Sequence, residues 1–201
     1  NCRTNGCWQI ISALFRLYET KGKILIDGVD VKTLSLGFLR SNISIIPQEP
    51  VLFKGTLREN LDPGSVYTDE EIWKAIAAVR LKKFLSSLDV AVEELETITA
   101  QKQLISLARV VLNDNKIVIL DEIVEDVDTE TEKLIHQIIE ESFTFCTVIK
   151  IAHKLKFVMD CDKILVMDNG EIIEYGVPNI LLQKEDSLFY RMVNIEDNVQ
   201  Y

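Results

Sequence analysis

The chain has 201 residues, of which 47% are hydrophobic and 27% are charged, so its length and composition suit a folded domain with one sizeable core. Its formal net charge of −10, without a basic cluster, argues against nucleic acid as a partner, because duplex binding needs Lys and Arg to displace counterions. The cysteines lack zinc-ligand or disulfide-framework spacing, and no apolar run approaches the ~20 residues that cross a bilayer. We therefore expect reduced thiols, and any membrane-spanning part to come from other polypeptide.

The first part of the chain predicts a helix, a strand, a short helix and a second strand. Apolar residues recur at helical spacing over Trp8–Tyr18, and Lys23–Ile26 is an apolar run closed by a turn. The next helix is expected at Leu36–Ser41 and the next strand at Ile43–Ile46. Gln48 follows that strand, and its amide oxygen could coordinate a metal or orient a water molecule. A lone glutamine in a loop is, alternatively, an ordinary solvated turn residue.

The middle of the chain is helical in pattern. A capping box at Thr68–Glu71 predicts a helix from about Asp69 through Val79, and Leu81–Leu88 is expected to continue as a shorter helix. Residues 89–99 are acidic, lack a turn glycine and predict no element. Apolar residues at helical spacing predict another helix over Ala100–Leu112.

The chain is organised around an apolar run, Lys116–Leu120, that ends in two carboxylates. A run without polar alternation is typical of a strand buried on both faces of a parallel sheet, and ligands bind at the carboxyl ends of such strands. There, Asp121 could hold a magnesium ion and Glu122 could polarise an attacking water, as phosphoryl transfer requires. The alternative is a solvated strand end followed by an acidic loop.

Another helix is expected at Thr129–Phe143 and another buried strand at Cys146–Ile151. His153 lies just past that strand, at the edge of Asp121 if the strands are parallel, although a capping or surface histidine is the alternative. The Asn-Gly pair at 169–170 predicts a hairpin, and two short helices are expected after it, at Asn179–Gln183 and Ser187–Val193. The alternation predicts an α/β fold with a mainly parallel sheet and a helical insertion around 69–112.

The order of the polar motifs is more specific than any one of them. Gln48 after a strand, Gln101–Leu104 opening a helix, Asp121-Glu122 after a strand and Ile151–His153 after another together resemble the nucleotide-binding domain of ABC transporters. Several longer stretches are similar to the C subfamily, the multidrug-resistance-associated transporters, and within it to the second, carboxyl-terminal nucleotide-binding domain: Ile46–Phe53, Gly55–Pro63 and Thr68–Ala75.

The resemblance implies a P-loop NTPase fold with ATP and Mg²⁺ as cofactors. It also implies partners, namely transmembrane domains and a second nucleotide-binding domain, a place on the cytosolic face of a membrane, and export of organic anions coupled to ATP hydrolysis. Carried over by position, it makes Gln48 the Q-loop residue that touches magnesium and Asp121 the Walker B metal residue. Glu122 becomes the catalytic carboxylate, Asp128 the D-loop aspartate and His153 the switch histidine that contacts the γ-phosphate.

The phosphate-binding loop departs from the pattern that the resemblance predicts. G-x-x-x-x-G-K-[ST] supplies glycines for close approach, a lysine at the phosphates and a hydroxyl for magnesium. Of this pattern only Gly6 is present; Cys7 replaces the lysine and Trp8 the hydroxyl residue. Arg3 could lend a positive charge. The residues of this degenerate loop are Arg3, Thr4, Asn5, Gly6, Cys7 and Trp8.

The signature loop departs as well. In the family, a serine hydroxyl and a glycine amide there hold the γ-phosphate bound to the opposite domain, whereas this chain has Ile98, Thr99, Ala100 and Gln101. Glu93-Glu94 replaces a glycine pair and brings negative charge towards a phosphate. The resemblance also places the family's first strands before residue 1.

The sequence thus predicts that residues 1–201 form a partial nucleotide-binding domain whose ATP turnover is weak or absent. One alternative is a pseudo-ATPase that keeps the fold as an interaction or regulatory surface. Another is the non-functional fragment of a decayed gene. A soluble ABC ATPase of the translation or repair type fits the C-subfamily stretches less well.

Overall fold

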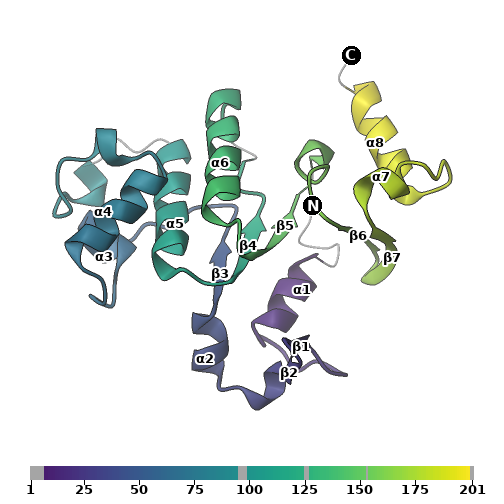
Figure 1. Cartoon of the computed structure of the whole chain (residues 1–201), viewed down its shortest axis with the longest axis horizontal. Helices are drawn as coiled ribbons and strands as arrows, with labels where there is room; N and C mark the ends of the chain where they lie inside the picture. Colours follow the sequence, from purple (N-terminus) through teal and green to yellow (C-terminus); the bar gives the residue numbers. More distant parts are fainter. Residues whose placement is uncertain (1–6, 95–98, 125–126, 153, 200–201) are drawn as a thin grey trace. The chain divides into compact units, whose positions relative to one another are not determined.

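The computed structural model describes residues 7–94, 99–124, 127–152 and 154–199, and it divides into two compact units (Figure 1). One unit is Ser41–Lys150; the other combines Asn1–Arg40 with Ile151–Tyr201. No helix among the described residues has both the length and the apolar character needed to cross a membrane.

The continuous unit is built on a parallel sheet with strand order β3-β4-β5. These strands are β3 (Ile43–Ile46), β4 (Ile117–Asp121) and β5 (Thr147–Ile151). β3 pairs with β4 in register from Ile43 opposite Ile117 to Ile46 opposite Leu120. Val118 and Ile119 of β4 are completely buried, which confirms the prediction of a central buried strand.

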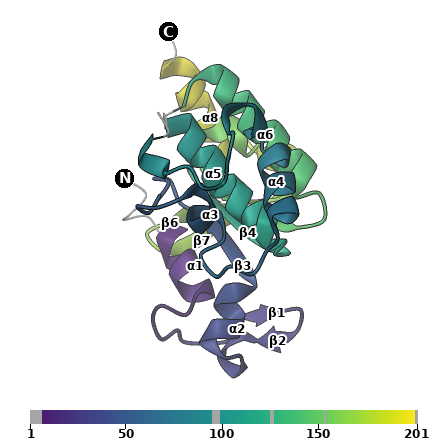
Figure 2. The same ribbon diagram turned by 90° about the vertical axis from the view of Figure 1, so that its left-hand side faces the viewer.

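Four helices complete this unit: α3 (Leu57–Leu61), α4 (Asp69–Ala78), α5 (Thr99–Asn113) and α6 (Thr129–Ser142). α5 contacts β3, and α3 and α4 lie beside α5, as Figures 1 and 2 show. Completely buried aliphatic side chains from these helices form the core: Leu57, Ile72, Ile76, Leu107, Ile135 and Ile138. Helix α4 lies within the range 69–112 that was predicted as a helical insertion, α5 covers the end of that range, and α3 precedes it.

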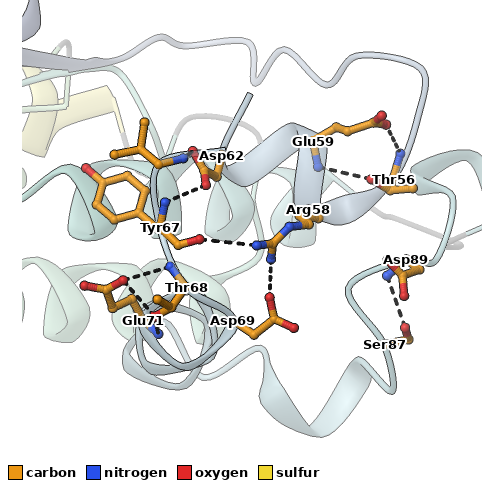
Figure 3. A network of polar contacts seen from close by, with 11 residues as sticks. Thr56, Arg58, Glu59, Asp62, Tyr67, Thr68, Asp69, Glu71, Ser87 and Asp89 are labelled. Carbon is orange, nitrogen blue, oxygen red and sulfur yellow. Dashed lines mark hydrogen bonds and ion pairs between the residues drawn. The ribbon is translucent and has the colours of Figure 1, made fainter. Parts of the chain in front are cut away.

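Capping boxes begin both α3 and α4 (Figure 3). The Thr56 hydroxyl accepts from the Glu59 amide at 3.1 Å while the Glu59 carboxylate accepts from the Thr56 amide at 2.8 Å. Thr68 and Glu71 repeat the arrangement at α4, as predicted. Arg58 joins the two helix starts, because its guanidinium donates to the Asp69 carboxylate and to the Tyr67 carbonyl. Satisfied first-turn amides thus define where these short helices start.

The second unit carries α1 (Cys7–Leu14), a β1-β2 hairpin (Leu25–Ile26 and Val29–Asp30), and α2 (Leu36–Ser41), whose last residue belongs to the other unit. Its second hairpin pairs β6 (Ile164–Asp168) with β7 (Glu171–Gly176). Asn169 and Gly170 have φ of 49° and 83°, as a two-residue type I′ turn requires, so the Asn-Gly hairpin is confirmed. α7 (Pro178–Leu181) and α8 (Leu188–Val199) pack on it around Leu181, Phe189, Ile164 and Val166.

Two arginines fix the carboxyl end of α1. The Arg16 guanidinium donates to the carbonyl oxygens of Val31 and Leu34 at 3.1 and 2.7 Å. Arg40 in turn donates to the carbonyl oxygens of Phe15 and Arg16 at 3.0 and 3.3 Å. Arg16 has a φ of 50°, so α1 ends before it, and the helix predicted through Tyr18 is shorter than expected.

The segment after α4 differs from the prediction. Leu81–Leu88 is not a helix: only a 3₁₀ turn, Lys82–Phe84, forms there, because Arg80 has a φ of 62° and Leu85 is extended. Beyond it, the Val90 and Leu88 carbonyls accept from the amides of Leu57 and Arg58 at 2.9 Å each, and the Val92 amide donates to the Gly55 carbonyl at 2.9 Å. This stretch, unassigned from sequence, therefore covers the start of α3.

Candidate nucleotide site at the sheet edge

Asp121 and Gln48 leave the sheet at the same edge. Ile46, the last residue of β3, lies opposite Leu120 of β4, so the residues that follow each strand emerge side by side. The Asp121 side chain is buried, at 3% exposure, whereas Gln48 is exposed. Carboxylate and amide oxygens are the donors that magnesium prefers, and both residue types follow parallel strands here at their carboxyl ends.

Glu122 follows Asp121 in a left-handed backbone conformation, with a φ of 50°. Such a conformation costs an ordinary residue about 1–2 kcal/mol and is most often found where the surroundings require it. The turn stops β4 abruptly, and Glu122 is half-buried while Ile123 and Val124 after it are buried. The backbone conformation thus changes between Asp121, the last residue of β4, and Glu122, the two acids that the sequence assigned to metal binding and to water activation.

Asp128 is the N-cap of α6. Its carboxylate accepts from the amides of Glu130 and Thr131 at 3.0 Å each and from the Thr131 hydroxyl at 2.6 Å. The Thr131 hydroxyl, followed by these amides, holds the pKa of the Asp128 carboxyl below its usual value. Asp128 is exposed, and the cap alone accounts for the residue type.

The segment after β3, residues 47–53, which the sequence predicts as the Q-loop segment, rests on α5 through Gln103, a member of the Gln101–Leu104 motif to which the sequence gave no role of its own. Gln103, a buried residue of α5 with 3% exposure, donates its side-chain amide to the Gln48 carbonyl at 2.7 Å. The two residues lie 55 positions apart, and no spacing rule relates them.

A second anchor lies three residues after Gln48. Arg109 of α5 donates to the Val51 carbonyl at 2.6 Å, to the Asn60 carbonyl, and to the Asn60 side-chain oxygen at 3.0 Å. Asn60 is buried and bonds both the amide and the carbonyl of Phe53 at 2.8 Å each. Burial lowers the pKa of the Arg109 guanidinium from its ordinary value, and the group stays charged at neutral pH. Residues 51–53 are thereby fixed to α3 and α5.

The start of α5 contains three of the four residues predicted for the signature loop. Thr99 is the first helical residue, Ala100 is buried at 8% exposure and Gln101 is half-buried, while Ile98 lies outside the described residues. The Glu93 carboxylate accepts from the Gly55 amide at 3.5 Å, so this acid is exposed yet held beside the start of α3.

The phosphate-binding loop residues Arg3, Thr4, Asn5 and Gly6 lie outside the described residues, as does His153. Cys7 and Trp8 are the first two residues of α1, the position at which the motif's lysine and hydroxyl residue open a helix. Of the three residues predicted to meet at the sheet edge, Asp121, Glu122 and His153, the structure therefore describes Asp121 and Glu122.

A family model described as "ABC transporter" matches residues 5–125, which is more than half of the chain. The chain belongs to the ABC transporter family. The chain is 48% identical over 194 residues to ATP-binding cassette sub-family C member 4 of Mus musculus, covering 94% of the chain and 15% of that protein. It is 43% identical to the Probable multidrug resistance-associated protein lethal(2)03659 of Drosophila melanogaster, covering 98% of the chain and 15% of the relative.

Among solved structures, a bacterial Atm1-family ABC exporter with ATP bound matches with a TM-score of 0.86 and 32% identity, covering 95% of this chain and 35% of the exporter chain. These relatives confirm the C-subfamily resemblance and the P-loop NTPase type of fold. This ABC domain thus spans about 15% of the length of its C-subfamily relatives.

The family implies ATP and typically Mg²⁺, and the residues of this chain fit Mg²⁺ better than they fit the phosphates of ATP. The metal side fits, because Asp121 and Gln48 offer oxygen donors at one edge and magnesium needs only one or two protein ligands beside phosphate and water. No cluster of three or more His, Cys, Asp or Glu residues forms a metal site within the described ranges. The phosphate side does not fit, because a thiol and an indole stand where an ammonium and a hydroxyl are needed.

Proposed function

We propose that this chain is the second nucleotide-binding domain of a multidrug-resistance-associated type transporter, and that its ATP-driven cycle is impaired. One observation carries the proposal: α1 begins with Cys7 and Trp8, where the family's lysine and hydroxyl residue stand. A lysine supplies a positive charge at the β- and γ-phosphates, and a charge-assisted hydrogen bond of this kind contributes roughly 1.5–3 kcal/mol. A neutral thiol supplies none of this energy.

The rest of the proposal follows the relatives. The domain associates with transmembrane domains and with a second nucleotide-binding domain on the cytosolic face of a membrane, and the complete transporter exports organic anions. The Walker B edge supports this placement, because Asp121, Glu122 and Gln48 have the residue types and positions of the family. The proposed loss concerns phosphate binding, and the magnesium-facing edge is retained.

Calorimetric titration of the 201-residue chain with Mg-ATP tests the impairment. We expect binding that is weak or absent, and partial recovery in the Cys7→Lys/Trp8→Ser double variant. Cys146→Lys is the control for the added charge. Cys146 is a half-buried cysteine just before β5, far from α1 in sequence. Micromolar affinity in the unmodified chain would refute the impairment.

A pseudo-ATPase that serves as an interaction surface is the second candidate. The observation that favours it is the combination of a substituted phosphate loop with a fully anchored Q-loop segment, in which Arg109 and Asn60 remain bonded. The same titration separates the two functions: recovered Mg-ATP affinity in the double variant favours an impaired transporter domain. Absence of binding in both proteins favours the pseudo-ATPase.

A further inference from the structure

Gln103 uses only half of its amide group. Its nitrogen donates to the Gln48 carbonyl at 2.7 Å, whereas its side-chain oxygen has no hydrogen-bond partner among the described residues. A carbonyl oxygen can only accept, so the amide nitrogen must be the atom that faces it. The role of Gln103 at this position is therefore that of a single buried donor.

The donor acts on a segment that α5 holds twice. Gln103 bonds the Gln48 carbonyl, and Arg109, further along the same helix, bonds the Val51 carbonyl at 2.6 Å. Arg109 and Asn60 hold the downstream end of the segment, and Gln103 bonds the Gln48 carbonyl at its upstream end. The exposed Gln48 side chain extends from the residue whose carbonyl Gln103 holds.

We infer that Gln103 is a positioning residue that fixes the backbone of Gln48 on α5, so that the Q-loop segment and the helix carrying the signature residues move as one body. Its relevance to nucleotide rests on the proposed function, which assigns Gln48 to the magnesium. The positioning itself needs no nucleotide.

Amide hydrogen exchange of the 201-residue chain, followed by mass spectrometry, tests this inference. Gln103→Met keeps the length and volume of the side chain and removes the donor to the Gln48 carbonyl; because the Gln103 side-chain oxygen has no hydrogen-bond partner among the described residues, no second hydrogen bond is lost with it. We expect exchange across residues 47–53 to accelerate between about 2-fold and about 12-fold, the range for one lost hydrogen bond. Exchange within α5 stays unchanged. Gln137→Met is the matched control, because Gln137 is an exposed helical glutamine of α6 in the same unit.

A conservative variant distinguishes positioning from simple loss of packing. Gln103→Glu has the same shape, and its carboxyl group can donate to the Gln48 carbonyl only when protonated, a state that burial favours. With rates normalised to the intrinsic exchange at each pH, we expect Gln103→Glu to approach the wild-type rate near about pH 5.5. Near about pH 8 it should exchange at least as fast as Gln103→Met.

Three results would overturn the inference: unchanged exchange at residues 47–53 in Gln103→Met, an equal increase throughout residues 41–150, or a Gln103→Glu protein whose protection ignores pH. All of these measurements are made without nucleotide. Failure of Mg-ATP to bind therefore bears on the proposed function alone, and the exchange result bears on Gln103 alone.

Discussion

Some residues that match the family's functional positions also have a structural role in this domain. Asp128 matches the D-loop position, yet its carboxylate is fully engaged in capping α6 through Thr131 and Glu130. Such a cap would preserve an aspartate here even without nucleotide, because Ser, Thr, Asp and Asn are the favoured capping residues. A matching residue type at this position is consequently weaker support for ATP turnover than the match at Asp121, which is a buried acid outside any helix cap.

We predict that Asp128 makes the stability of the chain depend on acidity. The pKa of Asp128 is lower in the folded chain than in the unfolded chain, because the Thr131 hydroxyl and amide donate to the carboxylate. Its contribution is complete above the unfolded value of about 3.9 and is lost as the pH falls through the lower folded value. Asp128→Asn keeps a capping oxygen and removes the titration. Urea unfolding from neutral to acidic pH should show wild type losing stability more steeply than Asp128→Asn in that acidic window.

Glu140→Gln is the charge-matched control for this experiment, because Glu140 is an exposed carboxylate towards the other end of α6. Parallel stability curves for wild type and Asp128→Asn would contradict the assigned cap.

At the scale of elements, two short helices start from the same local device. α3 has only five residues and α4 has ten, and both begin at a threonine whose hydroxyl accepts from the N3 amide. Helices this short are not stable by themselves, so the caps and the burial of Leu57, Ile72 and Ile76 must act together.

We predict that Thr56→Ala and Thr68→Ala each lower the free energy of unfolding by about 0.5–2 kcal/mol, the usual cost of losing an N-cap. The measurement is the urea midpoint at constant m-value. Thr129→Ala is the control, because Thr129 is an exposed first-turn residue one position after its cap. A midpoint shift in the control equal to that of the cap variants would contradict a specific capping role.

Sequence patterns predicted those elements whose signal is local. β3 and α2 have the predicted bounds, and the Thr68 box and the Asn-Gly turn were read correctly. α3 was missed, although Thr56 and Glu59 form the same box, because five residues are too few to show helical periodicity. The helix predicted after α4 was wrong, because a positive φ at Arg80 cannot be read from an arginine.

The residues of the candidate site, too, were predictable only where their sequence signal is local. Asp121 and Glu122 were predictable because the strand before them is an uninterrupted apolar run. The contacts of Gln103 and Arg109 were not predicted, because these residues bond backbone carbonyls 55 and 58 positions away and any residue type can supply a backbone carbonyl. Motif reasoning thus identifies residues that contact a ligand better than it identifies residues that hold those residues in place.

For the whole molecule, the important feature is that both phosphate-contacting motifs are altered in one chain. The resemblance to the family implies a head-to-tail pair of domains, in which each nucleotide lies between one domain's phosphate loop and the other's signature loop. Cys7 and Trp8 affect the first kind of contact; Ile98, Ala100 and the acidic Glu93-Glu94 pair affect the second. On the proposed function, one domain of this kind would therefore weaken both composite sites.

We predict no ATP-dependent dimerisation of this chain, either with itself or with an intact first domain. Each charge-assisted hydrogen bond lost from a phosphate removes roughly 1.5–3 kcal/mol, and several are lost per site. Light scattering with and without Mg-ATP should give the same mass. A dimer that forms with Mg-ATP and dissociates when EDTA removes the magnesium would contradict this prediction.

The left-handed backbone at Glu122 also limits which substitutions this position tolerates, even where natural selection no longer maintains its carboxylate for catalysis. Single-base changes in a glutamate codon lead to glycine, aspartate and valine, among others. Glycine relieves a conformation that costs an L-residue about 1–2 kcal/mol, and aspartate adopts it readily, whereas β-branched valine does not. Natural variants of a decaying domain would therefore accumulate glycine and aspartate at position 122 and exclude valine, so that the turn persists in the population after the chemistry has gone.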